Sequence, residues 1–302
     1  MTDVPNLLTI DVEDYFHANG LQSHVGRDDW NSLPGRVEYN TRRLLQQLDE
    51  HDVRATFFVL GWVAARYPEL IREIHTAGHE LASHGWDHEL VYDQSPGEFE
   101  QDVVRTKGYL EDLTGTAIYG YRAPSFSIVT HNWWALDVLA RTGHVYDSSV
   151  YPVRRRRGGV ADARPDIHTI LEPSAEGPGL IEVPPPSVSL LGRHWPVAGG
   201  GFFRFYPLWV TRAALRRMNR RDQRPGVVYL HPWEFDPEQP RLPGTMMNRW
   251  RHYLNLDRTQ PRLDSLLREF DFMSIAELLD LPLSVPVQRP RVAGVRDDLR
   301  AG

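Results

Sequence analysis

Short apolar segments alternate with longer amphipathic segments along most of the 302-residue chain, and this alternation constrains the fold more than any other feature. Segments rich in β-branched and aromatic residues are typical of buried strands. The predicted strands are Leu7–Asp11, Ala55–Val59, Glu80–Ser83, Tyr119–Arg122, Val145–Asp147 and Val227–Leu230. The predicted helices are Arg36–His51, Pro68–Ala77, Pro96–Leu113, Asn132–Arg141 and Pro207–Asn219. The pattern predicts a mainly parallel sheet covered by helices, either a barrel or an open sheet.

The alternation breaks around residues 152–200, where proline and glycine are frequent. We predict an irregular insertion there, with a hairpin formed by Asp166–Leu171 and Gly179–Val183. The chain length allows two domains or one α/β barrel, and we expect a single barrel over residues 1–282. Residues 283–302 are rich in proline and arginine, and we expect them to be poorly ordered.

Composition excludes several classes of protein. A net charge of −6 argues against a nucleic-acid-binding protein that relies on phosphate contacts. The absence of cysteine excludes disulfides, thiolate metal sites and cysteine nucleophiles. No apolar segment approaches the ~20 residues of a membrane span, and none resembles a signal-peptide core, so we expect a cytoplasmic protein. The run Arg154–Arg157 predicts either a solvated loop or recognition of an anionic ligand.

Ionisable clusters follow four of the predicted strands. These clusters are Asp11-Val12-Glu13-Asp14, His84-Gly85-Trp86-Asp87-His88, Arg122-Ala123-Pro124 and His231-Pro232-Trp233-Glu234. Because the carboxyl ends of parallel strands meet at the same edge of a sheet, we expect the clusters to lie together. One helical turn between His84 and His88 would place both imidazoles on the same side. Two imidazoles and a carboxylate suit zinc or a similar divalent ion.

The segments TIDVEDYF, SHGWDH, YRAPSF, YDSS and YLHPWE, in this order, resemble the polysaccharide deacetylases of the NodB-homology type, carbohydrate esterase family 4. The resemblance covers about residues 5–280. DVEDYF near the start and HPWEFDP near the end are similar to the branch associated with bacterial exopolysaccharide loci (exosortase-associated). The resemblance implies a distorted (β/α) barrel of about seven strands with an irregular C-terminal elaboration.

The resemblance also implies roles for individual residues of the first two clusters. Asp11 matches the general base of the family. The metal carboxylate normally follows directly or one residue later, and since Val12 occupies the adjacent position, the ligand is Glu13 or Asp14. Strand alternation favours Glu13 and an early turn favours Asp14. His84 and His88 match the two histidine ligands.

Three further residues match the rest of the catalytic set. Arg122 matches the arginine that holds the base ionised and oriented, and His231 matches the acid that protonates the leaving amine. Asp147 matches the aspartate that positions this histidine. The usual aromatic residue after the proline of the third motif is replaced by Ser125, followed by Phe126, which bears on the shape of the sugar pocket.

Aromatic residues beside these motifs are candidates for the walls of a sugar pocket or for ordinary core packing. With Ser125, the candidate substrate-binding residues are Tyr15, Trp86, Phe126 and Trp233. The segment from Gly199 to Arg204 is either a flexible lip over the site or a turn.

The implied activity is metal-dependent removal of acetyl groups from N-acetylated sugars of a polysaccharide or its precursor, with release of acetate. A cytoplasmic location would favour a precursor as the substrate. Two alternatives remain: an amidohydrolase that opens cyclic ureides or imides on the same scaffold, and a non-catalytic carbohydrate-binding relative. The complete set of acid, base and ligand residues argues against the last.

Overall fold

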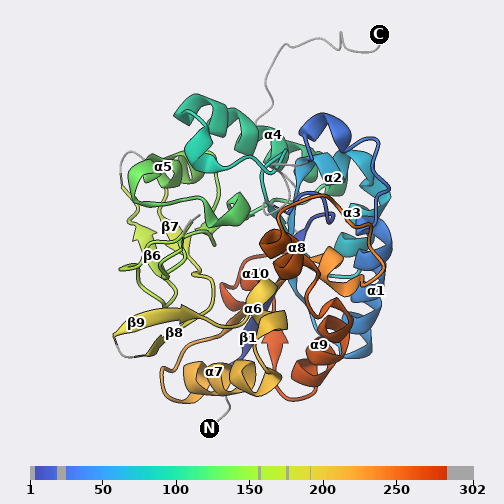
Figure 1. Ribbon diagram of the computed structural model, residues 1–302. Coiled ribbons are helices and arrows are strands. Elements are labelled where there is room, and N and C mark those ends of the chain that lie inside the picture. The colour runs from blue at the N-terminus through green and yellow to red at the C-terminus, as the bar shows by residue number, and fades with distance from the viewer. Residues whose placement is uncertain (1–3, 19–24, 156–157, 175–176, 191, 284–302) are drawn as a thin grey trace.

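The computed structural model describes residues 4–18, 25–155, 158–174, 177–190 and 192–283. The predicted tail at 283–302 lies outside them except for its first residue. The chain has a mixed α/β fold in which helices surround a curled, largely parallel sheet (Figure 1). The strands are β1 Asn6–Val12, β2 Thr56–Val59, β3 Glu80–Ser83, β4 Gly120–Tyr121, β5 Tyr146–Asp147, β6 His168–Leu171, β7 Leu180–Glu182, β8 Ser187–Leu190, β9 Arg193–Pro196, β10 Val227–Leu230 and β11 Phe272–Met273.

The main sheet has the strand order β10-β1-β2-β3-β4-β5-β7-β6, and β11 also pairs with β1. All pairs are parallel except β6 with β7, which form the predicted hairpin. Within the described residues, no ladder joins β10 to β6, so the predicted barrel is present as an open, curled half-barrel. Because β6 and β7 extend the sheet, part of the predicted insertion belongs to the main architecture, and β8 and β9 form a separate hairpin.

The helices are α1 Val37–Glu50, α2 Gly61–Arg66, α3 Pro68–Thr76, α4 Pro96–Thr114, α5 Trp134–Arg141, α6 Gly200–Phe205, α7 Leu208–Arg220, α8 Met246–Tyr253, α9 Thr259–Leu267 and α10 Ile275–Leu278. The five helices expected from periodicity are present within a few residues of their predicted bounds. The start of α4 shows why: Ser95 and Glu98 each accept a hydrogen bond from the other's backbone N–H, which satisfies amides that the helix leaves unpaired. None of the helices in the described residues is long and apolar enough to cross a membrane.

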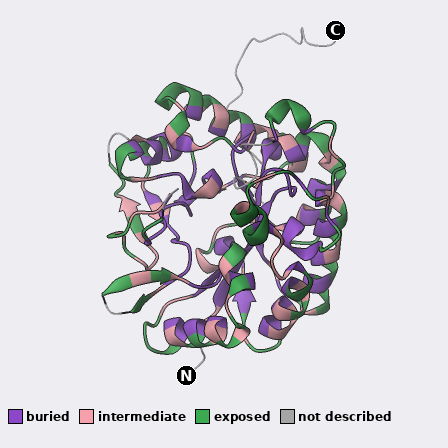
Figure 2. Ribbon diagram, viewed as in Figure 1, coloured by how far each residue is buried: buried purple, intermediate pink, exposed green. Residues whose placement is uncertain are grey.

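Strand β1 is an inner strand of the sheet, between β10 and β2, and is buried along its whole length. It pairs with β10 and β2, while Leu8 and Ile10 pack into the main core with Leu44 and Leu48 of α1. Burying each such side chain contributes about 1.5–3 kcal/mol. Figure 2 shows the buried residues gathered on the inner strands and the inward faces of the helices. The chain that leaves the carboxyl end of β1 is therefore held firmly on two sides.

Candidate active site

Asp11 and Glu13, at the end of β1, belong to one group of side chains, whereas Asp14 is directed toward the start of α1. A tight turn, closed by the Glu13 N–H donating to the Asp11 carbonyl at 2.9 Å, follows the strand. Asp14 accepts hydrogen bonds from the backbone N–H groups of Tyr15, Arg36 and Val37 at 2.7–3.0 Å. Asp14 thus satisfies amides at the start of α1, and burial raises its pKa to about 6. Of the two candidate ligands, the structure places Glu13 with the histidines.

The two histidines of SHGWDH are brought together by a loop and not by the expected helical turn. Gly85 and His88 both have left-handed backbone conformations, with φ values of 72° and 55°. A side chain at position 85 would also approach Asp102, whose carboxylate accepts the Trp86 N–H at 2.9 Å, so glycine fits both the conformation and the space. The imidazole ring centroids of His84 and His88 lie 5.5 Å apart.

Glu13, His84 and His88 form a buried cluster with the donor atoms that a metal ion requires. The Glu13 Oε1 atom lies 3.1 Å from His84 Nε2 and 2.9 Å from His88 Nε2. One ligand atom from each residue lies within 4.8 Å of the others. Although burial alone would raise the pKa of Glu13, His88, His231 and His84 hold it well below its usual value. An ionised carboxylate facing two imidazole nitrogens fits a divalent cation.

A second hydrogen bond fixes the orientation of one histidine. The His84 Nδ1 atom lies 2.7 Å from the carbonyl oxygen of Arg122. A carbonyl can only accept, so Nδ1 donates this hydrogen bond, and Nε2 is the ring nitrogen that faces Glu13. Outer contacts of this kind orient metal-binding histidines in proteins.

Asp11 is paired with a fully buried arginine. Arg122 donates from Nη1 to Asp11 Oδ1 at 2.7 Å and to the Thr9 hydroxyl at 2.9 Å, and its guanidinium lies over the ring of Phe58. The Ser148 hydroxyl accepts another of its hydrogen bonds at 2.9 Å. The other Asp11 oxygen, Oδ2, lies 3.7 Å from His231 Nε2. Asp11 is thus held in one orientation with an oxygen directed at His231.

His231 forms its closest charged contact with a residue that the sequence analysis gave no role. Its Nδ1 lies 2.9 Å from Glu234 Oε2, and the other oxygen of Glu234 accepts a hydrogen bond from Arg204 Nε at 2.7 Å. Burial alone would lower the pKa of His231, but the charges of Glu13, Glu234 and Asp11 raise it to about 9. His231 is therefore an imidazolium near neutral pH, as a general acid must be.

The expectation that Asp147 positions His231 is wrong. Asp147 accepts hydrogen bonds from the Ser149 hydroxyl and N–H and lies opposite Glu182 in the pairing of β5 with β7. Burial raises the pKa of Asp147 to about 6 and that of Glu182 well above its usual value. Asp147 therefore secures the strands beside the site, and Glu234 occupies the position beside the histidine.

A cavity of about 170 Å³ opens onto these groups. It is lined by Asp11, Glu13, Ala18, His88, Ala123, Ser125, Phe126, Arg155, Gly200, Gly201, Tyr229, His231 and Trp233. Three of the five predicted substrate-binding residues, Ser125, Phe126 and Trp233, thus line the cavity. Gly200 and Gly201 belong to α6, so the segment predicted as a lip or a turn forms a short helix beside the cavity.

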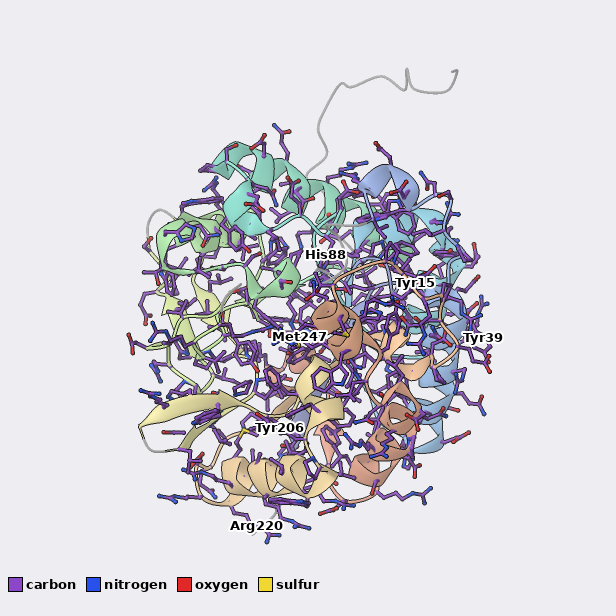
Figure 3. All side chains as sticks on the ribbon, viewed as in Figure 1. Tyr15, Tyr39, His88, Tyr206, Arg220 and Met247 are labelled. Carbon is purple, nitrogen blue, oxygen red and sulfur yellow. The ribbon has the colours of Figure 1, made fainter. Side chains whose placement is uncertain are left out.

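Tyr15 and Trp86 do not line this cavity, which corrects their predicted role. Tyr15 is fully buried in a cluster with Phe16 and Trp233. The indole of Trp86 is covered by the guanidinium of Arg105, 3.5 Å from the ring centroid. Both side chains pack within the protein. Figure 3 labels Tyr15 and also His88, which belongs to the cluster of Glu13, His84 and His88. Aromatic character next to a motif did not distinguish a pocket wall from core packing.

The sequence analysis assigned no role to Glu234 or Arg204 and left the role of Arg155 open. Glu234 had a visible signal, since it follows His231 by three residues in a turn-forming segment. Arg204 had none, because its pairing with Glu234 depends on how α6 packs. Arg155 lay within the arginine run whose role was left open between a solvated loop and a binding element.

Comparisons with known proteins show what this chain is similar to. Residues 28–145 match the family model "Polysaccharide deacetylase", and residues 148–280 match a "Domain of unknown function". The chain is 31% identical over 138 residues to a peptidoglycan deacetylase of Helicobacter pylori, covering 44% of this chain and 45% of that protein. It is 30% identical over 98 residues to a peptidoglycan-N-acetylglucosamine deacetylase of Bacillus cereus, covering 32% of this chain and 36% of that protein.

A solved structure extends the likeness to the whole fold. The crystal structure of a polysaccharide deacetylase-like protein from Mycobacterium smegmatis superposes with a TM-score of 0.60 at 21% identity, covering 97% of each chain. The chain spans less than half the length of the two curated relatives. The family model and the curated relatives show that part of this chain, residues 28–145 in the family model, is similar to polysaccharide deacetylases, and the solved structure shows that the fold is shared over nearly the whole chain.

Proposed function

We propose that the protein is a metal-dependent N-deacetylase that hydrolyses the acetamide of an N-acetylated sugar and releases acetate. One observation carries this proposal: Glu13 and His88, which form a cluster with His84, line the same cavity as Asp11 and His231. Amide hydrolysis requires an activated water, a proton for the departing nitrogen and charge stabilisation between them. Each requirement corresponds to a group on this cavity.

Glu13, His84 and His88 are the residues that would hold the metal. A bound divalent cation lowers the pKa of water from ~15.7 toward ~7 and polarises the carbonyl oxygen of the substrate. Glu13 would contribute negative charge, and the hydrogen bond from His84 Nδ1 to the Arg122 carbonyl leaves Nε2, 3.1 Å from Glu13 Oε1, as the nitrogen that would bind the cation. We propose zinc as the cation, since two imidazoles, one carboxylate and an open coordination position are a common catalytic zinc arrangement.

Asp11 acts as the base in this proposal. Arg122 binds Oδ1, so Oδ2 is the oxygen that accepts a proton from the attacking water. Because the arginine is fully buried and held by Thr9 and Ser148, the carboxylate keeps one orientation through the reaction.

His231 acts as the acid. Its Nδ1 is bound to Glu234, which leaves Nε2 to donate a proton to the amine as the C–N bond breaks. Glu234 is a positioning residue: Arg204 keeps it ionised, since the pKa of Glu234 falls to about 2 despite burial that would raise it. A fixed anion behind the imidazolium maintains both its charge and its orientation.

The substrate class follows from the relatives as a proposal. The matched proteins are named as deacetylases of peptidoglycan or of chitooligosaccharides. We propose an N-acetylglucosamine-type sugar within an exopolysaccharide or its precursor, with the reaction taking place in the cytoplasm. Phe126 and Trp233 would provide apolar walls for the pyranose ring.

The test measures acetate release from chitotetraose by the purified full-length protein, with and without zinc. We expect turnover that depends on the metal, disappears in Asp11→Asn and fails on allantoin, a cyclic ureide. Opening of allantoin without metal and without acetate release from sugars would contradict the proposal. Trp86→Phe is the control variant, because Trp86 lies outside the cavity and is expected to retain activity.

A further inference from the structure

One wall of the catalytic cavity carries a positively charged side chain, that of Arg155, which has no role in the proposed reaction. Arg155 follows β5 in the chain and lines the cavity together with Asp11, Glu13 and His231. Its side chain is exposed, and its guanidinium lies 5.7 Å from the ring centroid of Phe126 and 5.4 Å from that of Tyr151. The two aromatic rings support the side chain at the rim of the cavity.

The backbone around the arginine run explains how Arg155 comes to lie there. Gly158 has φ of +68°, and a Cβ on it would lie 2.3 Å from the Phe126 carbonyl oxygen, so the chain after the run packs directly on the segment that lines the cavity. The Tyr151 carbonyl accepts hydrogen bonds from the N–H groups of Val153 and Val160 at 2.7 and 2.8 Å. The described residues on either side of the run, Val153 and Val160, are therefore tied to Tyr151, and glycine is required at position 158, where backbone approaches backbone.

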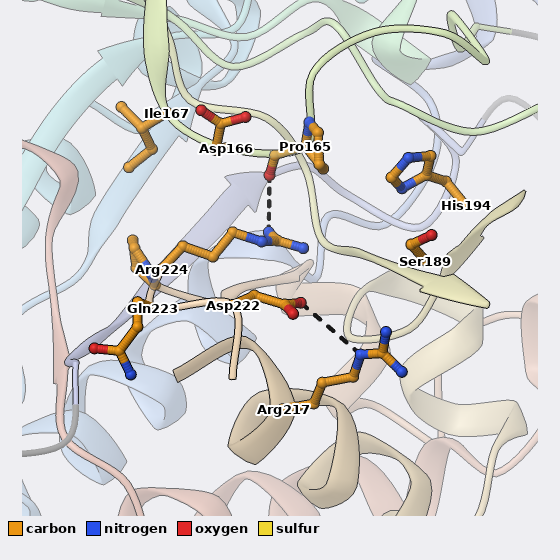
Figure 4. A pocket seen from close by; sticks show the side chains of 10 residues that line it. Pro165, Asp166, Ile167, Ser189, His194, Arg217, Asp222, Gln223 and Arg224 are labelled. Atoms are coloured by element: carbon orange, nitrogen blue, oxygen red, sulfur yellow. Dashed lines mark hydrogen bonds and ion pairs between the residues drawn. The ribbon is translucent and has the colours of Figure 1, made fainter. Parts of the chain in front are cut away.

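Arg155 has no carboxylate partner among the described residues, whereas the catalytic carboxylates are already paired. Asp11 pairs with Arg122, and Glu13 with the two histidines. A second cavity of about 640 Å³, near the amino-terminal end of β10, offers a contrast (Figure 4). Its Arg224 donates to the carbonyls of Pro165 and Ser187 at 2.8 and 2.6 Å and is thus committed to the fold. Arg155 retains its donors for a ligand.

We propose that Arg155 binds an anionic group, a carboxylate or a phosphate, on the substrate unit next to the sugar that is deacetylated. The proposal rests on the proposed function and specifies its substrate: a negatively charged glycan or a phosphorylated precursor. A guanidinium presents a planar set of donors that matches both kinds of anion. Arg155 lies in the region of residues 148–280, outside the segment that matches the deacetylase model, so this preference resides in a separate part of the chain.

The experiment compares charged and neutral substrates of the full-length, zinc-loaded protein. Hyaluronan tetrasaccharide supplies a carboxylate beside an N-acetylated sugar, and chitotetraose is its neutral counterpart. N-acetylglucosamine 1-phosphate supplies a phosphate, and N-acetylglucosamine is its counterpart. In Arg155→Gln we expect the ratio of KM for the charged to the neutral substrate to rise about tenfold for the source that Arg155 recognises, with kcat changed less.

Arg154→Gln is the matched control, because Arg154 is an exposed neighbour in the same run that does not line the cavity. We expect it to leave the KM ratio unchanged, and Arg155→Lys to restore part of the preference. A rise with hyaluronan alone would assign a carboxylate, and a rise with the sugar phosphate alone would assign a phosphate. Equal KM ratios in the wild type and Arg155→Gln for both pairs would overturn the proposal.

Failure of the proposed function gives a different result. If the wild type releases acetate from none of the four compounds, the deacetylase assignment is refuted, and the anion site is tested by calorimetric titration of the same compounds. About tenfold weaker binding of one charged compound to Arg155→Gln would still support the site. Equal binding to both proteins, or binding to neither, would overturn it.

Discussion

Two buried arginine–carboxylate pairs flank the catalytic cavity, one on the side of the base and one on the side of the acid. Arg122 donates to Asp11 and Arg204 donates to Glu234, each at 2.7 Å, and both arginine side chains are almost completely buried. In each pair, the arginine also donates to uncharged oxygens, which satisfies its remaining N–H groups. In both pairs, the opposite charge and the additional hydrogen bonds offset the cost of burying the arginine and the carboxylate.

The two pairs differ in whether the carboxylate keeps an oxygen that is not engaged in a hydrogen bond. Glu234 uses one oxygen for Arg204 and the other for the His231 ring and backbone N–H. Asp11 uses Oδ1 for Arg122, and its Oδ2 lies 3.7 Å from His231, beyond hydrogen-bond distance. A carboxylate with an available oxygen can accept a proton, while one with both oxygens engaged can only orient and charge its neighbour. This difference separates the base from the positioning residue.

Asp11→Asn removes the proposed base and should have the largest effect on kcat. An amide oxygen cannot accept the proton of the attacking water, so we expect kcat to fall by about 10³-fold or more. Zinc content and thermal stability serve as controls, because Asp11 does not belong to the Glu13–His84–His88 cluster. Turnover within a few-fold of the wild type would remove Asp11 from the role of base.

Glu234→Gln breaks the acid side and should have a smaller effect with a distinct pH signature. The reaction needs His231 protonated, so the rate falls as pH rises through its pKa of about 9. Removing the Glu234 charge lowers that pKa, and the alkaline limb of the kcat profile should move to lower pH, with about 10-fold lower kcat at pH 8. An unshifted limb would show that Glu234 does not control the protonation of His231.

Glu13→Gln and Asp14→Asn compare a carboxylate that lines the cavity with one that accepts hydrogen bonds from backbone N–H groups. Glu13→Gln should lose zinc, because it removes the negative charge of one of three ligands. Asp14→Asn should keep zinc and instead lower the free energy of unfolding by about 1–3 kcal/mol, since the amide NH2 replaces one of the two oxygens that accept backbone N–H groups. Zinc analysis and urea denaturation of both variants measure the two outcomes, and loss of zinc from Asp14→Asn alone would reverse the assignment.

The smallest expected effect is on KM and concerns two aromatic residues, Trp233 and Trp86. Trp233 lines the cavity, and its ring stacks on His231 with centroids 5.2 Å apart. Trp233→Leu should raise KM for chitotetraose about five- to tenfold, because it removes part of the apolar wall of the cavity beside His231, a contact worth about 1 kcal/mol or more. Trp86→Leu should leave KM within twofold. Equal effects of the two substitutions would argue against Trp233 as a wall of the substrate site.

On the base side, the patterns in the sequence are local. Strand alternation favoured Glu13 over Asp14, although β1 ends at Val12 and Glu13 lies in the turn after it. Two histidines four residues apart at the next-but-one strand end suggested a shared ligand, but left-handed Gly85 and His88 replace the expected helical turn. Local spacing indicated residues that the structure brings together, without indicating the backbone that joins them.

On the acid side, the pairing of Arg204 with Glu234 joins distant segments and escaped sequence reasoning, although Glu234 lies only three residues after His231. Arg204 belongs to α6, which begins in three consecutive glycines and therefore has poor helix propensity. The helix is held by packing: Gly199 bridges to Tyr229 of β10, and Arg204 donates to carbonyl oxygens of His252 and Leu254. None of these contacts has a periodic signal, and the assignment of the histidine's partner to Asp147 was wrong for the same reason.

The metal cluster is the central claim, and a crystal structure of the zinc-loaded protein with anomalous scattering data tests it most directly. We expect one zinc ion bound by Glu13 Oε1, His84 Nε2 and His88 Nε2, with an open position toward Asp11 and His231. Zinc bound through Asp14, or a fully loaded crystal without zinc between these two histidines, would contradict the account.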